Sequence, residues 1–284
     1  MTALLDELVA LLDIAEVSDG VFVGQQAAAA ARTGHVFGGL VAGQATVAAY
    51  RTVEAGRPMH SLHAYFLRRG NPLLPIDFRV EATRDGRAFS HRRVSAIQDG
   101  HAIMEMACSF ATLERGLAHQ MAMPEVIAPE QLRSDWEYLR DIPGTVDPVT
   151  IPGPIDIRSA EPHSQITREL GETTDRSRMW MRADGDLPDD PVVHTAVLVY
   201  SSDLTVLDPV TRPHALSVFA SDVLPSSIDH ALWIHGPIRA DEWWLCDADS
   251  TWAGDGRGFV RGRVFDRGGR LVAQIAQEGL IRLP

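Results

Sequence analysis

Three histidines are the first candidates for acid–base chemistry. His60 and His63 lie in one apolar segment, and His230 lies in another. The ordinary pKa of imidazole is near neutral pH, so each side chain could accept or donate a proton in a reaction. His60 and His230, however, occupy equivalent positions of the internal repeat described below. This duplication favours a structural hydrogen bond that occurs in each half, rather than a role in a single active site.

Two arginine pairs have the chemistry of an anion site. Arg68-Arg69 and Arg92-Arg93 could hold phosphate oxygens, because a guanidinium fork matches the spacing of two such oxygens. Solvated strand ends would explain both pairs nearly as well. We therefore keep a phosphate site as one of two interpretations.

Gln277 and the two cysteines lie in apolar segments. Gln277 is an amide between Ile275 and Gly279, and an amide can both donate and accept hydrogen bonds. Cys108 and Cys246 are too few for a disulfide framework or a zinc cluster, and a small buried thiol explains each. No metal or redox cofactor is expected.

The composition excludes some classes of protein. The chain has 284 residues, 45% of them hydrophobic, and a net charge of −12, which argues against nucleic acid as a partner. Apolar runs stay below the ~18 residues of a membrane span. The N-terminal apolar run contains Asp6 and Glu7 and has no basic leader. We expect a cytoplasmic protein without stable membrane insertion.

The elements that must position these residues occur twice. Asp85-Gly-Arg-Ala-Phe-Ser-His-Arg-Arg-Val94 returns 170 residues later as Asp255-Gly-Arg-Gly-Phe-Val-Arg-Gly-Arg-Val264. The same displacement places His60 on His230 and Leu62 on Leu232. A repeat of this length indicates duplicated domains, because solenoid and propeller units run only about 20–50 residues.

Each half is predicted to hold one helix followed by an antiparallel meander. In the first half, residues 35–50 are rich in small residues and lack a charged face, which indicates a buried helix. The strands predicted after it are 59–68, 76–83, 87–98 and 101–113, separated by turns that include Asp85-Gly86 and Asp99-Gly100. An amphipathic helix over 2–14 and a short strand over 21–24 precede them.

The second half repeats this order. A helix is predicted over 192–207 and strands over 228–235, 243–251, 258–266 and 270–282. We expect an α+β double hotdog, two tandem hotdog domains in each of which an antiparallel sheet wraps around a central helix. The domains are assigned to 1–120 and 155–284, and 121–154 is a linker with one helical turn near Trp136.

Several short motifs recur in a characteristic order and spacing over nearly the whole chain. They are Val36-Phe-Gly-Gly39 with Gly43-Gln44, His60-Ser-Leu-His-Ala-Tyr-Phe-Leu-Arg68, Asp85-Gly-Arg with Arg92-Arg-Val, Ser202-Asp-Leu204, Ile228-Asp-His230 with Trp233 and His235, Gly258-Phe-Val-Arg-Gly262, and Gln277-Glu-Gly279. Together these motifs resemble the acyl-CoA thioesterase II family.

The resemblance implies hydrolysis of a fatty acyl-CoA to a free fatty acid and CoA. The family holds the attacking water with an Asp, a Ser or Thr, and a Gln, and the matching positions are Asp203, Ser227 and Gln277. Of the three, Asp203 alone can act as the base. Ser227 and Gln277 can orient the water, which lowers the entropic part of the barrier. The same residues could otherwise be a helix cap, a strand entry and a core amide.

The first half is expected to lack a second site. Gln44, Arg57 and Cys108 are set against Asp203, Ser227 and Gln277, which leaves no base. The predictions are therefore one active site per chain and a structural first half. The alternative function is a non-catalytic acyl-CoA-binding hotdog protein, and a hydratase is disfavoured because no His follows Asp203 within two helical turns. A homodimer or homotetramer is expected, since hotdog sheets commonly pair.

Overall fold

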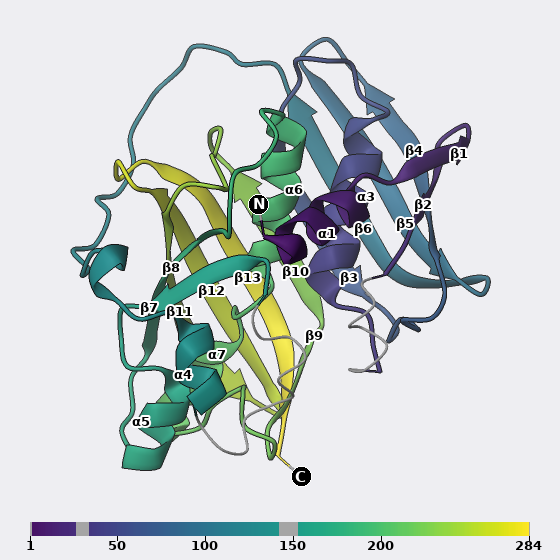
Figure 1. Cartoon of the computed structure of the whole chain (residues 1–284). Coiled ribbons are helices and arrows are strands. Elements are labelled where there is room, and N and C mark those ends of the chain that lie inside the picture. Colours follow the sequence, from purple (N-terminus) through teal and green to yellow (C-terminus); the bar gives the residue numbers. More distant parts are fainter. Residues whose placement is uncertain (1, 27–33, 142–152, 284) are drawn as a thin grey trace.

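A computed structural model describes residues 2–26, 34–141 and 153–283. Its helices and strands follow the predicted order, and the sheet is antiparallel throughout (Figure 1). The helices are α1 (Ala3–Leu12), α3 (Gly38–Tyr50), α4 (Asp135–Asp141), α5 (Ser164–Leu170), α6 (Pro191–Ser202) and α7 (Asp208–Thr211), with short 3-10 helices at Pro129–Gln131 and Arg212–His214. The strands are β1 (Ala15–Ser18), β2 (Val21–Gly24), β3 (Met59–Phe66), β4 (Ile76–Asp85), β5 (Phe89–Gln98), β6 (His101–Ala111), β7 (Ile155–Ser159), β8 (Arg176–Ala183), β9 (Leu224–Ser227), β10 (Asp229–Ile234), β11 (Trp244–Gly254), β12 (Arg257–Asp266) and β13 (Leu271–Arg282).

The sheets of the two halves are joined into one. The strand order is β1-β2-β4-β5-β6-β3-β10-β13-β12-β11-β8-β7, and β9 pairs with β13 outside this path. The junction is the antiparallel pair β3 and β10, in which Leu62 lies directly opposite Leu232. These two leucines are the repeat equivalents found in the sequence. An antiparallel pair centred on equivalent residues relates the two halves by an approximate two-fold axis.

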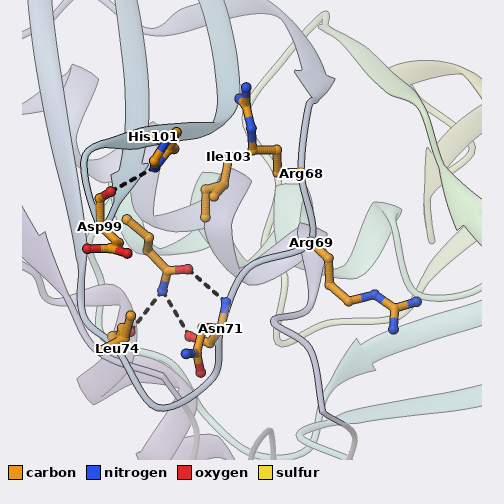
Figure 2. A pocket seen from close by; sticks show the side chains of 8 residues that line it. Arg68, Arg69, Asn71, Leu74, Asp99, His101 and Ile103 are labelled. Carbon is orange, nitrogen blue, oxygen red and sulfur yellow. Dashed lines mark hydrogen bonds between the residues drawn. The ribbon is translucent and has the colours of Figure 1, made fainter.

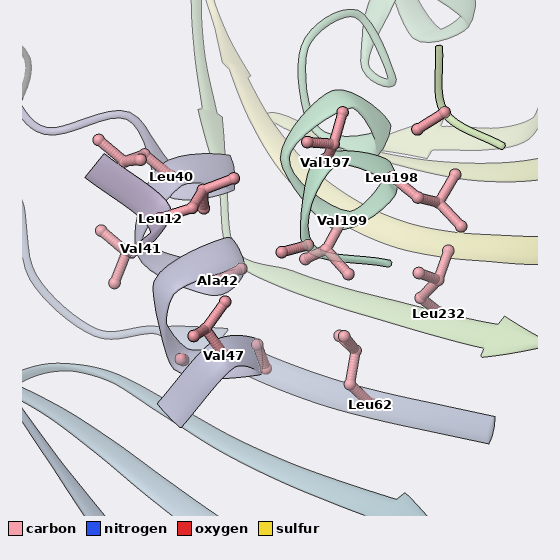
Figure 3. Packing of buried hydrophobic residues seen from close by; sticks show 14 of the residues in the cluster. Leu12, Leu40, Val41, Ala42, Val47, Leu62, Val197, Leu198, Val199 and Leu232 are labelled. Atoms are coloured by element: carbon pink, nitrogen blue, oxygen red, sulfur yellow. The ribbon is translucent and has the colours of Figure 1, made fainter. Parts of the chain in front are cut away.

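The two central helices pack side by side inside the curved sheet (Figure 1; Figure 3). All residues of α3 from Gly39 to Ala49 are buried, which explains why the predicted helix lacks a charged face. Gly43 allows the close approach, since a Cβ there would lie 3.2 Å from the Ala196 carbonyl oxygen of α6. Helix α1 packs Leu5, Leu8 and Leu12 against this pair.

Two Asp-Gly turns have the backbone that their sequences favour. The predicted turn Asp99-Gly100 has φ of 47° and 74°, and Asp255-Gly256, the repeat equivalent of Asp85-Gly86, has φ of 52° and 72°. Two successive positive φ angles are the signature of the tight hairpin turn that Asp-Gly sequences favour. Gly86 has no positive φ, and its N–H bonds Phe89 O in a wider turn. The repeat therefore preserves the strands better than this turn.

Several elements were absent from the prediction or bounded differently. Helix α6 ends at Ser202, so the prediction of a helix to 207 was too long, and residues 208–211 form the separate α7. Strands β1, β7, β8 and β9 were missed. The helical turn near Trp136 is α4, whereas 142–152 of the assigned linker lie outside the described residues. The domain boundaries stay predictions.

Over the described residues, no helix has both the length and the apolar character needed to cross a membrane. The same residues contain no group of three or more His, Cys, Asp and Glu side chains placed to hold a metal ion.

Candidate active site

The fold brings Asp203, Ser227 and Gln277 together, although they are far apart in the sequence. Asp203 caps the C-terminus of α6, and Ser227 is the last residue of β9. Gln277 lies on β13, two residues before Gly279, which pairs with Ser227. The end of a buried helix and two neighbouring strands therefore converge on one point.

The three side chains form a closed triangle of hydrogen bonds. Ser227 Oγ donates to Asp203 Oδ1 at 3.1 Å. Gln277 Nε2 donates to the same Oδ1 at 3.1 Å and to Ser227 Oγ at 2.8 Å. Both hydrogens of the Gln277 amide are thus directed at oxygen atoms of the site.

Asp203 lies in an environment that favours its protonated form. Burial raises the pKa of this carboxyl above its ordinary value, because few water molecules solvate the charge. Nearby His230, the bonds from Gln277 and Ser227, and a backbone hydrogen bond from Gly39 lower the pKa and offset part of that rise. A carboxylate with a raised pKa is a stronger base than an exposed aspartate.

The N-terminus of α3 supplies the other wall of the site, so both halves build it. A Cβ on Gly38 would lie 2.9 Å from Asp203 Oδ2 and equally close to the Phe66 ring. A Cβ on Gly39 would lie 2.5 Å from the Tyr200 carbonyl oxygen. The first N–H groups of a helix have no intrahelical partner and carry a partial positive charge. Glycine at both positions lets these amides approach the carboxylate.

His230 is a component that sequence reasoning placed outside the site. Its Nδ1 contacts Gln277 Oε1, and its Nε2 lies 2.8 Å from Ser202 Oγ. His60, its repeat equivalent, bonds Ser109 Oγ at 2.8 Å. The two histidines therefore bond different partners, so the expected hydrogen bond shared by both halves is not found, and only His230 holds an amide of the site. The amide of Gln277 in an apolar strand could have indicated such a residue, since a buried glutamine requires hydrogen-bond partners for both its oxygen and its nitrogen.

The other histidine and the first-half residues lie apart from the triangle. His63 is exposed and packs edge-on against Trp233. Gln44 lies in the middle of α3, where Nε2 donates to Leu11 O and Gln25 O, so it does not occupy the helix-end position of Asp203. That position in α3 is Arg51.

Strand register settles one further first-half assignment. Cys108 lies opposite Leu62 as Ile275 lies opposite Leu232, so Cys108 corresponds to Ile275 and the comparison with Gln277 was wrong. Arg57 donates to Gly86 O and Ser90 Oγ.

The two arginine pairs differ in what they can bind. Arg92 is 3% exposed, and its guanidinium bonds Thr52 and Asp85, so it has no group left for a phosphate. Arg93 is paired with Glu81. Arg92 is therefore excluded as a phosphate ligand, and Arg93 would have to leave Glu81 to bind a phosphate.

Arg68 and Arg69 border a surface pocket of about 390 Å³ (Figure 2). Arg68 donates to Ala102 O at 2.7 Å, whereas Arg69 is exposed and has no hydrogen bond or ion pair within the described residues. The buried Gln98 side chain supports the pocket by bonding the backbone of Asn71 and Leu74.

The fold and both halves of the sequence match known proteins. A protein with the hotdog fold from Alicyclobacillus acidocaldarius, 19% identical, superposes with a TM-score of 0.80 over 98% of each chain, which supports the fold alone. Two central helices wrapped by one joined sheet define a double-hotdog protein. Residues 26–111 match the family of the acyl-CoA thioesterase N-terminal domain, and 124–281 match that of its C-terminal domain. The chain belongs to the acyl-CoA thioesterase II family.

Several relatives cover most of the chain. The Haemophilus influenzae protein named acyl-CoA thioesterase 2 is 33% identical over 99% of both chains. Acyl-coenzyme A thioesterase 8 of Rattus norvegicus is 37% identical over 87% of this chain and 80% of its own length. The crystal structure of an acyl-CoA thioesterase II from Mycobacterium marinum, 37% identical, superposes with a TM-score of 0.80 over 98% of each chain.

Proposed function

We propose that this protein hydrolyses fatty acyl-CoA to a free fatty acid and CoA, with one active site per chain. The observation that carries the proposal is the buried Asp203 carboxylate, hydrogen-bonded to Ser227 and Gln277 beside the N-terminus of α3. Membership of the thioesterase family supports the same reaction. A protein that only binds acyl-CoA has no chemical need for a buried base at this position.

In the proposed mechanism, Ser227 and Gln277 hold a water molecule against Asp203. The water oxygen attacks the thioester carbonyl carbon while Asp203 takes one of its protons. The carbonyl oxygen becomes negative, and the partial positive charge at the N-terminus of α3 stabilises it. The intermediate collapses by breaking the carbon–sulfur bond, and the proton on Asp203 passes to the leaving CoA thiolate. The products are a fatty acid and CoA, and the carboxylate is restored.

The direct test is release of free thiol from a panel of acyl-CoAs with short to long chains. Wild-type turnover on at least one chain length would support the hydrolase. Tight binding of acyl-CoA without turnover across the whole panel would contradict it and favour the binding protein. The same panel measures the chain-length preference.

The pH dependence provides a second prediction. Because burial raises the pKa of Asp203, kcat should fall on acidification at a pH above the ordinary range of an aspartate. The bond from Ser227 lowers that pKa, so Ser227→Ala should move the acidic limb to higher pH. A pH profile of kcat measured for both proteins checks this. An acidic limb that stays in place in Ser227→Ala would exclude Asp203 as the titrating base.

A third prediction concerns CoA. We propose that Arg69 meets a phosphate of CoA, because it borders a surface pocket and has no hydrogen bond or ion pair within the described residues, on a chain of net charge −12. Arg69→Ala should raise KM about three- to tenfold without changing kcat, and the difference should shrink as salt is added. Arg93→Ala is the matched control, since Glu81 already pairs that arginine. An equal rise in KM for both variants would show a general charge effect and not a site.

Three further expectations stay predictions: a cytoplasmic location, a homodimer or homotetramer, and a reaction without metal or redox cofactor. Gel filtration with light scattering tests the oligomeric state. Turnover after exhaustive treatment with a chelator tests whether a metal is needed, and the absorption spectrum of the purified protein tests for a redox cofactor.

A further inference from the structure

The buried histidine His230 lies at the end of the Gln277 amide that faces away from Asp203. Its Nδ1 contacts Gln277 Oε1, and its Nε2 lies 2.8 Å from Ser202 Oγ. Only 1% of the His230 surface is exposed. The imidazole therefore links the last residue of α6 to the strand that carries Gln277.

The orientation of the Gln277 amide decides whether the triangle can exist. In the observed orientation Nε2 gives one hydrogen to Asp203 Oδ1 and the other to Ser227 Oγ. After a half-turn, Oε1 would face the carboxylate, and two acceptors would repel each other. The two ends of an amide have nearly the same shape, so packing alone does not select between the two orientations. A hydrogen-bond donor beside Oε1 does select the observed orientation.

We propose that His230 is a positioning residue, whose Nδ1–H holds Gln277 Oε1 and thereby keeps the amide hydrogens on Asp203 and Ser227. This inference rests on the proposed hydrolase function. Oε1 is only an acceptor, so Nδ1 must carry the hydrogen. The Ser202 hydroxyl, which donates to Val199 O at 2.8 Å, lies 2.8 Å from Nε2 and holds the other side of the ring. The first-half copy, His60 with Ser109, has no amide to position.

Two substitutions of His230 distinguish the role of Nδ1 from that of Nε2. The amide of an asparagine can occupy the place of Nδ1, whereas that of a glutamine reaches toward the place of Nε2. We expect His230→Gln to lower kcat about 10–100-fold, because a misplaced reacting group costs that much, with KM within about twofold. His230→Asn should retain a larger share of kcat. Equal losses in both variants would contradict the proposal.

The chain offers a matched control directly after β10 and on the exposed face of β13. His235 Nε2 lies 2.9 Å from Gln274 Oε1, and both residues are exposed. His235→Gln should leave kcat unchanged. If it lowers kcat as much as His230→Gln does, the loss reflects the strand pair and not the site.

A double-mutant cycle distinguishes positioning from a merely structural role. If His230 acts through Gln277, His230→Gln should cause no further loss of kcat in a Gln277→Ala background. A structural role would multiply the two losses. Multiplied losses with both proteins folded at the assay temperature would overturn the inference.

A measurement without turnover keeps this inference separable from the proposed function. Nitrogen NMR of protein with labelled histidine reports which ring nitrogen carries hydrogen, and the His230 signals are identified by their absence in His230→Gln. We expect a protonated Nδ1 in the wild type. An Nδ1 with a free lone pair would overturn the positioning role, whereas no thiol release from any acyl-CoA would overturn the function alone.

Discussion

Asp203→Asn should lower kcat on the order of 10²–10⁴-fold, because removal of a general base costs that much. Asparagine keeps the volume and can still accept a hydrogen bond from Ser227 or Gln277, but it cannot take a proton from water. Substrate affinity should change far less, since the carboxylate acts on the water and not on the acyl chain. Thiol release at saturating acyl-CoA and binding of acyl-CoA to the variant measure the two effects separately.

Stability measurements show whether this loss is chemical. Burial raises the pKa of Asp203, so the ionised group costs folding free energy, and that cost grows as pH rises through the folded-state pKa. The Tm of Asp203→Asn relative to wild type should therefore increase with pH. Asp222→Asn, which removes an exposed partner of Arg168, is the control for activity. Turnover of Asp203→Asn equal to that of the control would exclude Asp203 as the base.

Gly39→Ala should disrupt the site from the other half of the chain. The new Cβ would lie 2.5 Å from the Tyr200 carbonyl oxygen, and backbone cannot move aside as a flexible side chain can. Overpacking of this kind costs about 1–3 kcal/mol of folding free energy. The start of α3 would move away from Asp203, and we expect kcat/KM to fall about 100-fold, the cost of a misplacement near 1 Å. Thermal unfolding and thiol release measure both effects.

Gly43→Ala separates packing from catalysis in the same helix. Its Cβ would lie 3.2 Å from the Ala196 carbonyl oxygen, so it also strains the contact between α3 and α6, but it lies one turn beyond Gly39. We expect a lower Tm with kcat/KM within about threefold of wild type. If the loss of activity in both variants is proportional to the decrease in Tm, α3 contributes to the site only through packing.

The strands and central helices could be predicted because their signals are local. Asp99-Gly100 and Asp255-Gly256 adopt the backbone that such turns favour, and the small residues of α3 allow a helix to be buried on all sides. The end of α6 could not be predicted in this way. Ser201 and Ser202 bond carbonyl oxygens of their own helix, and the chain leaves the helix at Asp203, so the polar end resembles a continuing helix in sequence.

The sequence by itself determined that one architecture occurs twice, because Leu62 and Leu232 and the two Asp-Gly-Arg motifs share a displacement that requires no coordinates. It supplied Asp203, Ser227 and Gln277 only through a family resemblance, since residues 24, 50 and 74 positions apart share no helical or strand period. Only the tertiary structure decided that these side chains bond one another, that α3 of the first half faces the carboxylate, and that His230 lies behind the amide. The physical reason is that pairing of β3 with β10 and of β9 with β13 sets these distances, and strand pairing between distant segments depends on the packing of the whole chain.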